Sequence, residues 1–539
     1  MRPVKLLAWL VPDLALVAAC VALVYCLFLF QGYQKLFRDS DAGWHIRAGE
    51  AILSTGDLPR TDPYSFTRAG QPWFAWEWMA DTATGAVHRA AGLSGVALFY
   101  AAAIAAGVWL WFRLHWALDG SFLLACAMAP LLLSTCNIHW LARPHILSWL
   151  FLLAALLYAE RARPPFRFRH VVEIAIFTEL WANIHASFFF APLIALIYAA
   201  GYASRRRSAR WFLWAALISA LAPLANPYGW HLYAHVFRYL TDSELLARIG
   251  EFQSFDFHAP GSWPIIATLL VGVAGGTLAL LPPASEYSAK TWGLTNVSQG
   301  RHSLSPYGVP ARRRADASVS PRVFAPWRES GGRPEHFALA MLITAMALRS
   351  ARALPLVALL LLPLANAAIT ATLRRAGVLD GFLTYSARLR AMDARFSGLA
   401  LVPLVLLAAF ALLRLPAIQA ATGFPPDQFP VEAYSQVAHL PAAARLFAPD
   451  KFGGYLIYRS QGARKVFFDG RSDLYGADFL KQYARMVQLR PGWRDYWESF
   501  HFTHALIPND YPLIPALEQI GWKALYHDQT VTLLRWGML

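Results

Sequence analysis

Charged residues are scarce in this sequence, and their scarcity excludes a soluble protein of this size. Asp, Glu, Lys and Arg together make up 15% of the 539 residues, whereas hydrophobic residues make up 57%. The mean hydropathy of +0.37 is also too high for a soluble chain of this length. The composition therefore indicates an integral membrane protein.

Cysteine is rarer still, with four residues in the whole chain. Cys20, Cys26, Cys126 and Cys136 all lie in apolar runs or at their ends. This placement excludes a disulfide framework and a cysteine-based metal site. We expect the four thiols to be small packing residues.

Acidic residues are fewer than basic ones, 33 against 48, and the formal net charge is +15. A positive charge of this size is compatible with nucleic-acid binding, but the excess lies in short loops beside apolar segments. Basic residues in such loops set the orientation of the chain in the membrane and contact anionic lipid head groups. We therefore expect membrane lipids as partners and no nucleic acid.

Apolar runs predict about eleven transmembrane helices, since a spanning helix needs roughly 20 apolar residues. The first run continues past Cys20 to Phe30, which is too long for a typical signal-peptide core. One apolar stretch is divided at Asn183 to His185, because the arginine clusters on both sides of it favour the cytoplasm. The windows are 9–31, 94–112, 121–136, 145–159, 171–183, 187–203, 211–225, 262–281, 336–349, 353–372 and 398–415.

Polar motifs and arginine clusters alternate between these windows. The arginine clusters are Arg161/Arg163/Arg167/Arg169, Arg205/Arg206/Arg207/Arg210 and Arg374/Arg375. The motifs are Asp39-Ser40-Asp41, Glu77-Trp78, Arg143-Pro144-His145, Asn183-Ile184-His185 and Glu251 to His258. With the arginine loops in the cytoplasm, all the motifs meet at the outer surface. We expect a multi-pass membrane protein with its N-terminus in the cytoplasm.

The predicted fold class is an all-α polytopic transmembrane bundle with a small C-terminal extracytoplasmic α/β domain. The transmembrane module covers 1–415, with a first outer loop at 32–93 and a flexible cytoplasmic loop at 282–335 that lacks apolar periodicity. The outer domain covers 416–539. Its predicted strands are 455–458, 465–468, 503–507 and 530–534.

The first outer loop carries the strongest chemical signal. Asp39 and Asp41 come just after the first apolar run, where carboxylates can deprotonate a hydroxyl or bind a divalent cation. The residues that follow, Gly43 to Ser54, predict an interfacial helix with Trp44 as a head-group anchor. An alternative is that Asp41 only caps this helix, because Asp is a favoured N-cap residue.

The other motifs allow both functional and structural interpretations. Arg143 can pair with a lipid phosphate or serve as an interfacial anchor. The stretch from Glu251 to His258 alternates acids with aromatics, as in a sugar or metal pocket or in an interfacial aromatic belt. Asn226-Pro227-Tyr228-Gly229-Trp230 predicts a helix stop and turn. Asp469-Gly470-Arg471-Ser472-Asp473 favours a structural turn over catalysis, and its context also permits a binding role.

The motifs resemble those of the GT-C superfamily of polytopic glycosyltransferases, in particular of uncharacterised bacterial members. They are Asp41-Ala42-Gly43-Trp44-His45, Trp76-Glu77-Trp78, Arg143-Pro144-His145, Asn183-Ile184-His185, Asn226-Pro227-Tyr228-Gly229-Trp230 and Asp469-Gly470-Arg471-Ser472-Asp473. The resemblance covers most of the chain except 282–335. It implies transfer of a sugar from a polyprenyl-phosphate donor to a lipid, glycan or protein acceptor at the extracytoplasmic face.

The resemblance also implies roles for individual residues. Asp41 would be the catalytic base, Asp39 its partner, and both are candidate ligands for a divalent cation, Mg or Mn. The candidate substrate-binding residues are His45, Glu77, Trp78, Arg143, His145, His185, Glu251, Asp256 and His258.

Two other classes of protein compete with the enzyme. A transporter or flippase for lipid-linked glycans would carry ionisable residues inside its spans and often internal repeats, whereas here the acids cluster in loops. A non-catalytic scaffold with an outer binding domain would use Asp39 and Asp41 only as caps.

Overall fold

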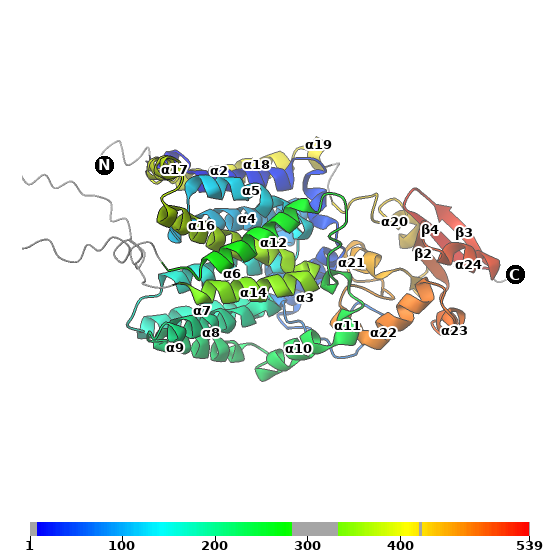
Figure 1. The fold of residues 1–539 in the computed structure, drawn as a ribbon. Helices are drawn as coiled ribbons and strands as arrows, with labels where there is room; N and C mark the ends of the chain where they lie inside the picture. Colours follow the sequence, from blue (N-terminus) through cyan, green and yellow to red (C-terminus); the bar gives the residue numbers. More distant parts are fainter. Residues whose placement is uncertain (1–7, 283–331, 420–422, 538–539) are drawn as a thin grey trace, which may run out of the picture.

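The computed structural model describes residues 8–282, 332–419 and 423–537, and it divides into a helical bundle and a C-terminal part at one end of it (Figure 1). Nearly all of the predicted flexible loop at 282–335 lies outside the described residues. The bundle helices run along a common direction in Figure 1. They are α2 (Leu14–Leu27), α4 (Trp78–Ala117), α5 (Phe122–Cys136), α6 (His145–Arg161), α7 (Phe168–Ile184), α8 (Phe190–Ser204), α9 (Arg210–Leu221), α12 (Trp263–Leu278), α14 (Pro334–Arg349), α16 (Leu362–Ala376) and α18 (Val402–Leu413).

Each predicted apolar window contains a helix, and the division at Asn183 to His185 is correct because α7 ends at Ile184. By length and composition, 5 helices of the described residues can cross a membrane, and several others are shorter apolar helices. The number of crossings therefore stays a prediction. All four cysteines are unpaired and at least partly buried, as expected for packing residues.

Helix α4 overlaps the end of the predicted first outer loop. It begins at Trp78, well inside the predicted 32–93 loop, and bends at Gly92, whose φ is 65°. The sequence near its start contains acids and histidine, which lowered its hydropathy and made it look like a loop. Helix α3 (Asp41–Thr55) packs against this first part of α4 so closely that a Cβ on Gly49 would lie 1.7 Å from the Asp81 carbonyl oxygen.

Trp44 is not a head-group anchor, because α3 is buried between α4 and the C-terminal part. The side chain is 7% exposed and packs on Trp73, at a ring distance of 6.1 Å. A glycine pair explains how the C-terminal part covers α3, since a Cβ on Gly43 would lie 2.2 Å from the carbonyl oxygen of Gly454. Helix α3 is therefore an internal support of the bundle end.

The C-terminal part contains a sheet of order β1-β2-β4-β3, in which β1 and β2 are parallel and the other pairs antiparallel. The strands are β1 (Leu446–Phe447), β2 (His504–Pro508), β3 (Trp522–His527) and β4 (Val531–Trp536). The helices are α20 (Tyr434–Ala438), α21 (Asp450–Arg459), α22 (Ser472–Val487), α23 (Trp493–Glu498) and α24 (Leu513–Gln519). The domain boundary at residue 415 stays a prediction.

Two of the four predicted strands are confirmed and two are wrong. The predicted strands at 503–507 and 530–534 correspond to β2 and β4. The stretch 455–458 lies in α21 instead, because its apolar residues form the buried side of a short amphipathic helix. The stretch 465–468 forms only one isolated bridge, from Val466 to Ser65 of the first loop.

The C-terminal part and the start of α2 lie at opposite ends of the bundle (Figure 1). Helices α6 and α8 end, and α7 and α9 begin, at the end away from the C-terminal part. The arginine clusters therefore lie at one end and the motif loops at the other.

Candidate active site

Asp41 is the first residue of α3, and the preceding acid fixes its backbone. Ser40 occupies the N-cap position, but its hydroxyl donates to the Asp450 carbonyl oxygen at 3.5 Å and does not cap the helix. The Asp39 Oδ1 atom accepts a hydrogen bond of 2.9 Å from the Asp41 backbone N–H. Asp41 is therefore not the N-cap of α3, and its carboxylate faces other partners.

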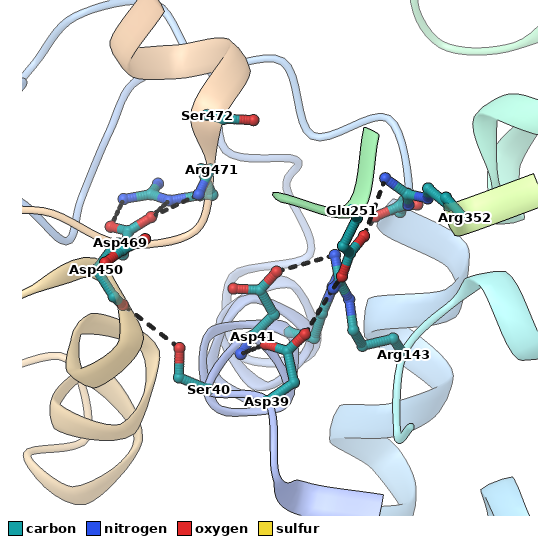
Figure 2. Close-up of polar contacts among 12 residues, drawn as sticks. Asp39, Ser40, Asp41, Arg143, Glu251, Arg352, Asp450, Asp469, Arg471 and Ser472 are labelled. Carbon is teal, nitrogen blue, oxygen red and sulfur yellow. Dashed lines mark hydrogen bonds and ion pairs between the residues drawn. The ribbon is translucent and has the colours of Figure 1, made fainter. Parts of the chain in front are cut away.

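Three carboxylates contact one guanidinium, that of Arg143 (Figure 2). Arg143 Nη1 donates to Asp39 Oδ2 at 2.6 Å and to Glu251 Oε1 at 2.9 Å. Arg143 Nη2 forms an ion pair with Asp41 Oδ2 at 2.9 Å. Glu251 also faces Arg352, with 3.6 Å between Oε2 and Nη1. Segments far apart in the chain thus build one partly buried cluster of acids and arginines.

The environment sets opposite protonation preferences for two of these acids. Burial and the neighbouring Asp39 carboxylate raise the pKa of Asp41 to about 8, against the opposing effect of Arg143. Burial acts in the same direction on Glu251, but the charges of Arg143 and Arg352 outweigh it and lower its pKa below the usual range. At neutral pH, Glu251 is therefore the ionised partner of the arginines, and Asp41 holds a proton that it can exchange.

A second polar network joins α3, the start of α4 and the end of α7. His45 Nδ1 and Asp81 Oδ1 are 2.6 Å apart, and Glu77 lies between the two histidines, 3.9 Å from His45 Nε2 and 3.6 Å from His185 Nε2. Burial raises the pKa of Glu77 to about 7. Trp78 donates from Nε1 to Asn183 Oδ1 at 2.7 Å, which ties α4 to the end of α7. The sequence interpretation missed Asp81, although its spacing from Glu77 places both on one helical face.

The C-terminal part closes over Asp41 through the turn that precedes α22. A Cβ on Gly470 would lie 1.9 Å from Asp41 Oδ1. Arg471 pairs with Asp469 at 2.7 Å and with Asp62 of the first loop at 2.8 Å, and all three side chains are buried. Asp473 Oδ2 lies 3.2 Å from His235 Nε2. The Arg471 contacts match the predicted structural turn, but the turn also forms a wall of the site.

A cavity of about 570 Å³ opens beside Asp41. Its polar wall contains Asp41, Glu77, Arg143, Arg349, Arg352 and Asp473. Its apolar wall contains Trp149, Leu152, Phe189, Phe190, Met346 and Leu356, all from the helical bundle. The cavity can therefore hold a molecule with a charged head and an apolar tail.

The structure brings most of the predicted site residues together but not all of them. Asp41, Glu77, Arg143, His145 and His185 line the cavity. Four other predicted residues do not line the cavity but contact residues that line it or residues next to these. They are Asp39, His45, Trp78 and Glu251.

Asp256 and His258 lie outside the cavity lining and are exposed. Asp256 Oδ1 accepts a bond of 2.9 Å from the His258 backbone N–H, so the pair forms a local turn. Asn226 likewise accepts from the Tyr228 N–H at 2.7 Å, in the helix-ending turn predicted for that motif.

The acids of this site do not fit a divalent cation as arranged. No group of three His, Cys, Asp or Glu residues within the described part of the chain is placed to hold a metal ion. The oxygens of Asp39, Asp41 and Glu251 that would be the natural ligands all face Arg143 instead. The arrangement of these carboxylate oxygens therefore does not support the expected Mg or Mn site.

The sequence matches no protein-family profile and no curated protein. Solved structures do match. A crystal structure of the Archaeoglobus fulgidus oligosaccharyltransferase tethered with an acceptor peptide is 11% identical with a TM-score of 0.50, covering 92% of this chain and 68% of that one. The archaeal oligosaccharyltransferase AglB from the same organism, in complex with an inhibitory peptide and a dolichol-phosphate, is 12% identical with a TM-score of 0.51, covering 92% and 69%.

At this identity the similarity concerns the fold, and it extends over both the bundle and the C-terminal part. The chain therefore shares the fold of these oligosaccharyltransferases, which agrees at the level of the fold with the resemblance that its motifs indicated.

Proposed function

We propose that the protein is a membrane glycosyltransferase that moves a sugar from a polyprenyl-phosphate donor to an acceptor at the extracytoplasmic face. The observation that carries this proposal is the placement of Asp41, a buried acid with a raised pKa, beside arginines in a cavity lined by both charged and apolar side chains. A sugar linked through phosphate to an apolar chain has the matching chemistry. The GT-C fold supports the assignment by analogy.

Arg349 and Arg352 are the proposed phosphate-binding residues. Both line the cavity at the end of α14, where Met346 begins the apolar wall. A guanidinium can bind phosphate oxygens through two parallel hydrogen bonds. The phosphate would lie at these arginines, with the polyprenyl chain along the apolar wall toward the bilayer.

Asp41 is the proposed catalytic base. The nucleophile of the acceptor forms a bond to the anomeric carbon, and the bond from that carbon to the phosphate oxygen breaks. Asp41 takes the proton of the nucleophile, and polyprenyl phosphate leaves with the electron pair. Asp39 positions the site by binding both the Asp41 backbone and Arg143.

The acceptor would enter beside the C-terminal part. Trp76, Tyr239, Ser472 and Asp473 line this side of the cavity. Aromatic rings and hydrogen-bonding groups there suit a glycan, and the same surface can receive a lipid or protein group. We propose an orientation with the arginine clusters in the cytoplasm of a bacterial inner membrane and the C-terminal part outside.

A buried ion cluster at the opposite end of the bundle bears on the transporter alternative. Glu160 binds Arg333 Nη2 at 2.8 Å and His336 Nε2 at 2.7 Å, and Glu335 binds Arg205 at 3.0 Å. These residues lie in the last turn of α6, around the start of α14 and just after α8. They join helix ends at one boundary of the bundle, which favours a structural clamp over an ion path through its middle.

The direct experiment incubates the purified full chain with a panel of labelled polyprenyl-phosphate sugars and with membrane lipid, glycan and peptide acceptors. Formation of a labelled product that requires the protein supports the proposal. Melting in the presence of each donor is measured in parallel, because a bound donor raises the melting temperature. The absence of both transfer and donor-dependent stabilisation overturns the proposal in favour of a scaffold or transporter.

A further inference from the structure

Arg143 occupies the place in the acidic cluster where a divalent cation would be bound. Its two terminal nitrogens lie 2.6 to 2.9 Å from one oxygen each of Asp39, Asp41 and Glu251 (Figure 2). A magnesium ion would need oxygen ligands around a common centre at about 2.1 Å. The guanidinium already fills the space among these oxygens, so an ion could enter only if the side chain left.

The structure holds Arg143 firmly in this place. Its side chain is only 14% exposed. The loop that carries it is tied to the first outer loop by a hydrogen bond of 2.8 Å from the Ala142 N–H to the Leu36 carbonyl oxygen. Moving the guanidinium away would leave the Asp39 and Asp41 carboxylates without their cation, which is unfavourable for partly buried charges.

We propose that Arg143 is the resident cation of the active site and takes the role that the resemblance gives to Mg or Mn. This inference rests on the proposed glycosyl transfer. The guanidinium orients Asp41 through Oδ2, while Oδ1 of the same carboxylate lies against Gly470. Arg352, which faces Glu251 from the far side, supplies the second positive charge near the proposed phosphate position. Transfer by this protein accordingly needs no divalent ion.

The first test measures Mn²⁺ binding and does not depend on transfer. The full-length protein is stripped with EDTA, and Mn²⁺ binding is followed by electron paramagnetic resonance and by thermal melting. We expect Asp39 and Asp41 to hold no Mn²⁺ in wild type. Any Mn²⁺ that wild type binds should therefore still be bound by Asp39→Asn and by Asp41→Asn. We expect Arg143→Ala to gain a Mn²⁺ site, because three freed carboxylates then face one cavity.

Arg352→Ala is the matched control, since it removes a positive charge from the same cluster but not from its centre. We expect no Mn²⁺ site in this variant. We also expect none in Arg143→Lys, which keeps a cation at the centre of the cluster. This second variant is used if Arg143→Ala does not fold. Mn²⁺ bound by wild type and lost in Asp39→Asn or Asp41→Asn would overturn the proposal. A folded Arg143→Ala that binds no Mn²⁺ would overturn it as well.

The second test applies once a donor has been found. We expect EDTA to leave the transfer rate of wild type unchanged, and a loss of transfer restored by Mg²⁺ or Mn²⁺ would contradict the role of Arg143. If no donor supports transfer, the proposed function fails, whereas the Mn²⁺ measurements still decide which cation occupies the site.

Discussion

Asp41 lies directly against Gly470, although the two residues belong to opposite ends of the chain. A Cβ on Gly470 would lie 1.9 Å from Asp41 Oδ1, the oxygen that does not face Arg143. The first outer loop supplies the proposed base, and the C-terminal part supplies the backbone that covers it. The two segments therefore form one site, which explains why α3 and α21 pack through glycines.

The first prediction concerns this contact. Gly470→Ala should lower kcat by about 100-fold, because displacing a catalytic group by roughly 1 Å has an effect of that order. The control is Gly381→Ala, where a Cβ meets nothing within 4 Å. Transfer rates and melting temperatures of both variants would be compared with wild type. A fully active Gly470→Ala would show that the contact is not needed.

The second prediction concerns pH. Asp41 must be a carboxylate to accept a proton, and burial raises its pKa to about 8. Below that value the acid is protonated and inactive as a base, so kcat/KM should rise with pH and level off above about pH 8. The profile would be measured between about pH 6 and pH 9.5 with melting checked at each end. A rate independent of pH over this interval would argue against Asp41 as the base.

The third prediction concerns the ion triplet of Arg471, Asp469 and Asp62. Arg471→Met should lower the free energy of unfolding by about 3–5 kcal/mol, because two buried carboxylates then lose their cation. Asp427→Asn, at an exposed position of the C-terminal part, should change it by less than about 0.5 kcal/mol. Denaturation of both variants in the same detergent measures the difference. Equal stability of the two would mean that the triplet does not join the first loop to the C-terminal part.

The fourth prediction concerns donor binding. Arg352→Ala should raise the KM for the donor by about 10- to 100-fold with a smaller change in kcat, since a hydrogen bond to a charged group contributes about 1.5–3 kcal/mol. Arg238→Ala removes an exposed arginine outside the cavity and should leave KM unchanged. Steady-state kinetics over a range of donor concentrations distinguish the two parameters. A pure kcat effect in Arg352→Ala would instead place this residue at the transferring group.

The sequence predicted the helices well because apolar residues concentrate in the segments that are buried in lipid or in the bundle. It also indicated Asp41 and Arg143 as candidate site residues, since both lie in polar loops beside apolar runs. It could not predict that Asp39, Asp41 and Glu251 share one guanidinium, because this depends on how distant loops fold toward each other.

The errors follow from local ambiguity. The apolar run Tyr455 to Tyr458 is equally compatible with a strand and a short helix, and packing against α3 decides for the helix. Asp81 was missed because the first turns of α4 are too polar to be recognised as part of a long apolar helix. Gly470 was assigned to a turn, and nothing in its neighbours indicates that the turn covers Asp41.

The most direct test of the account is transfer by Asp41→Asn compared with wild type, using the donor that the panel identifies. Asn keeps the shape of the side chain but cannot accept the proton, so we predict a well-folded variant that still binds the donor and transfers at least about 100-fold more slowly. An Asp41→Asn protein that transfers at the wild-type rate would contradict the assignment of Asp41 as the base.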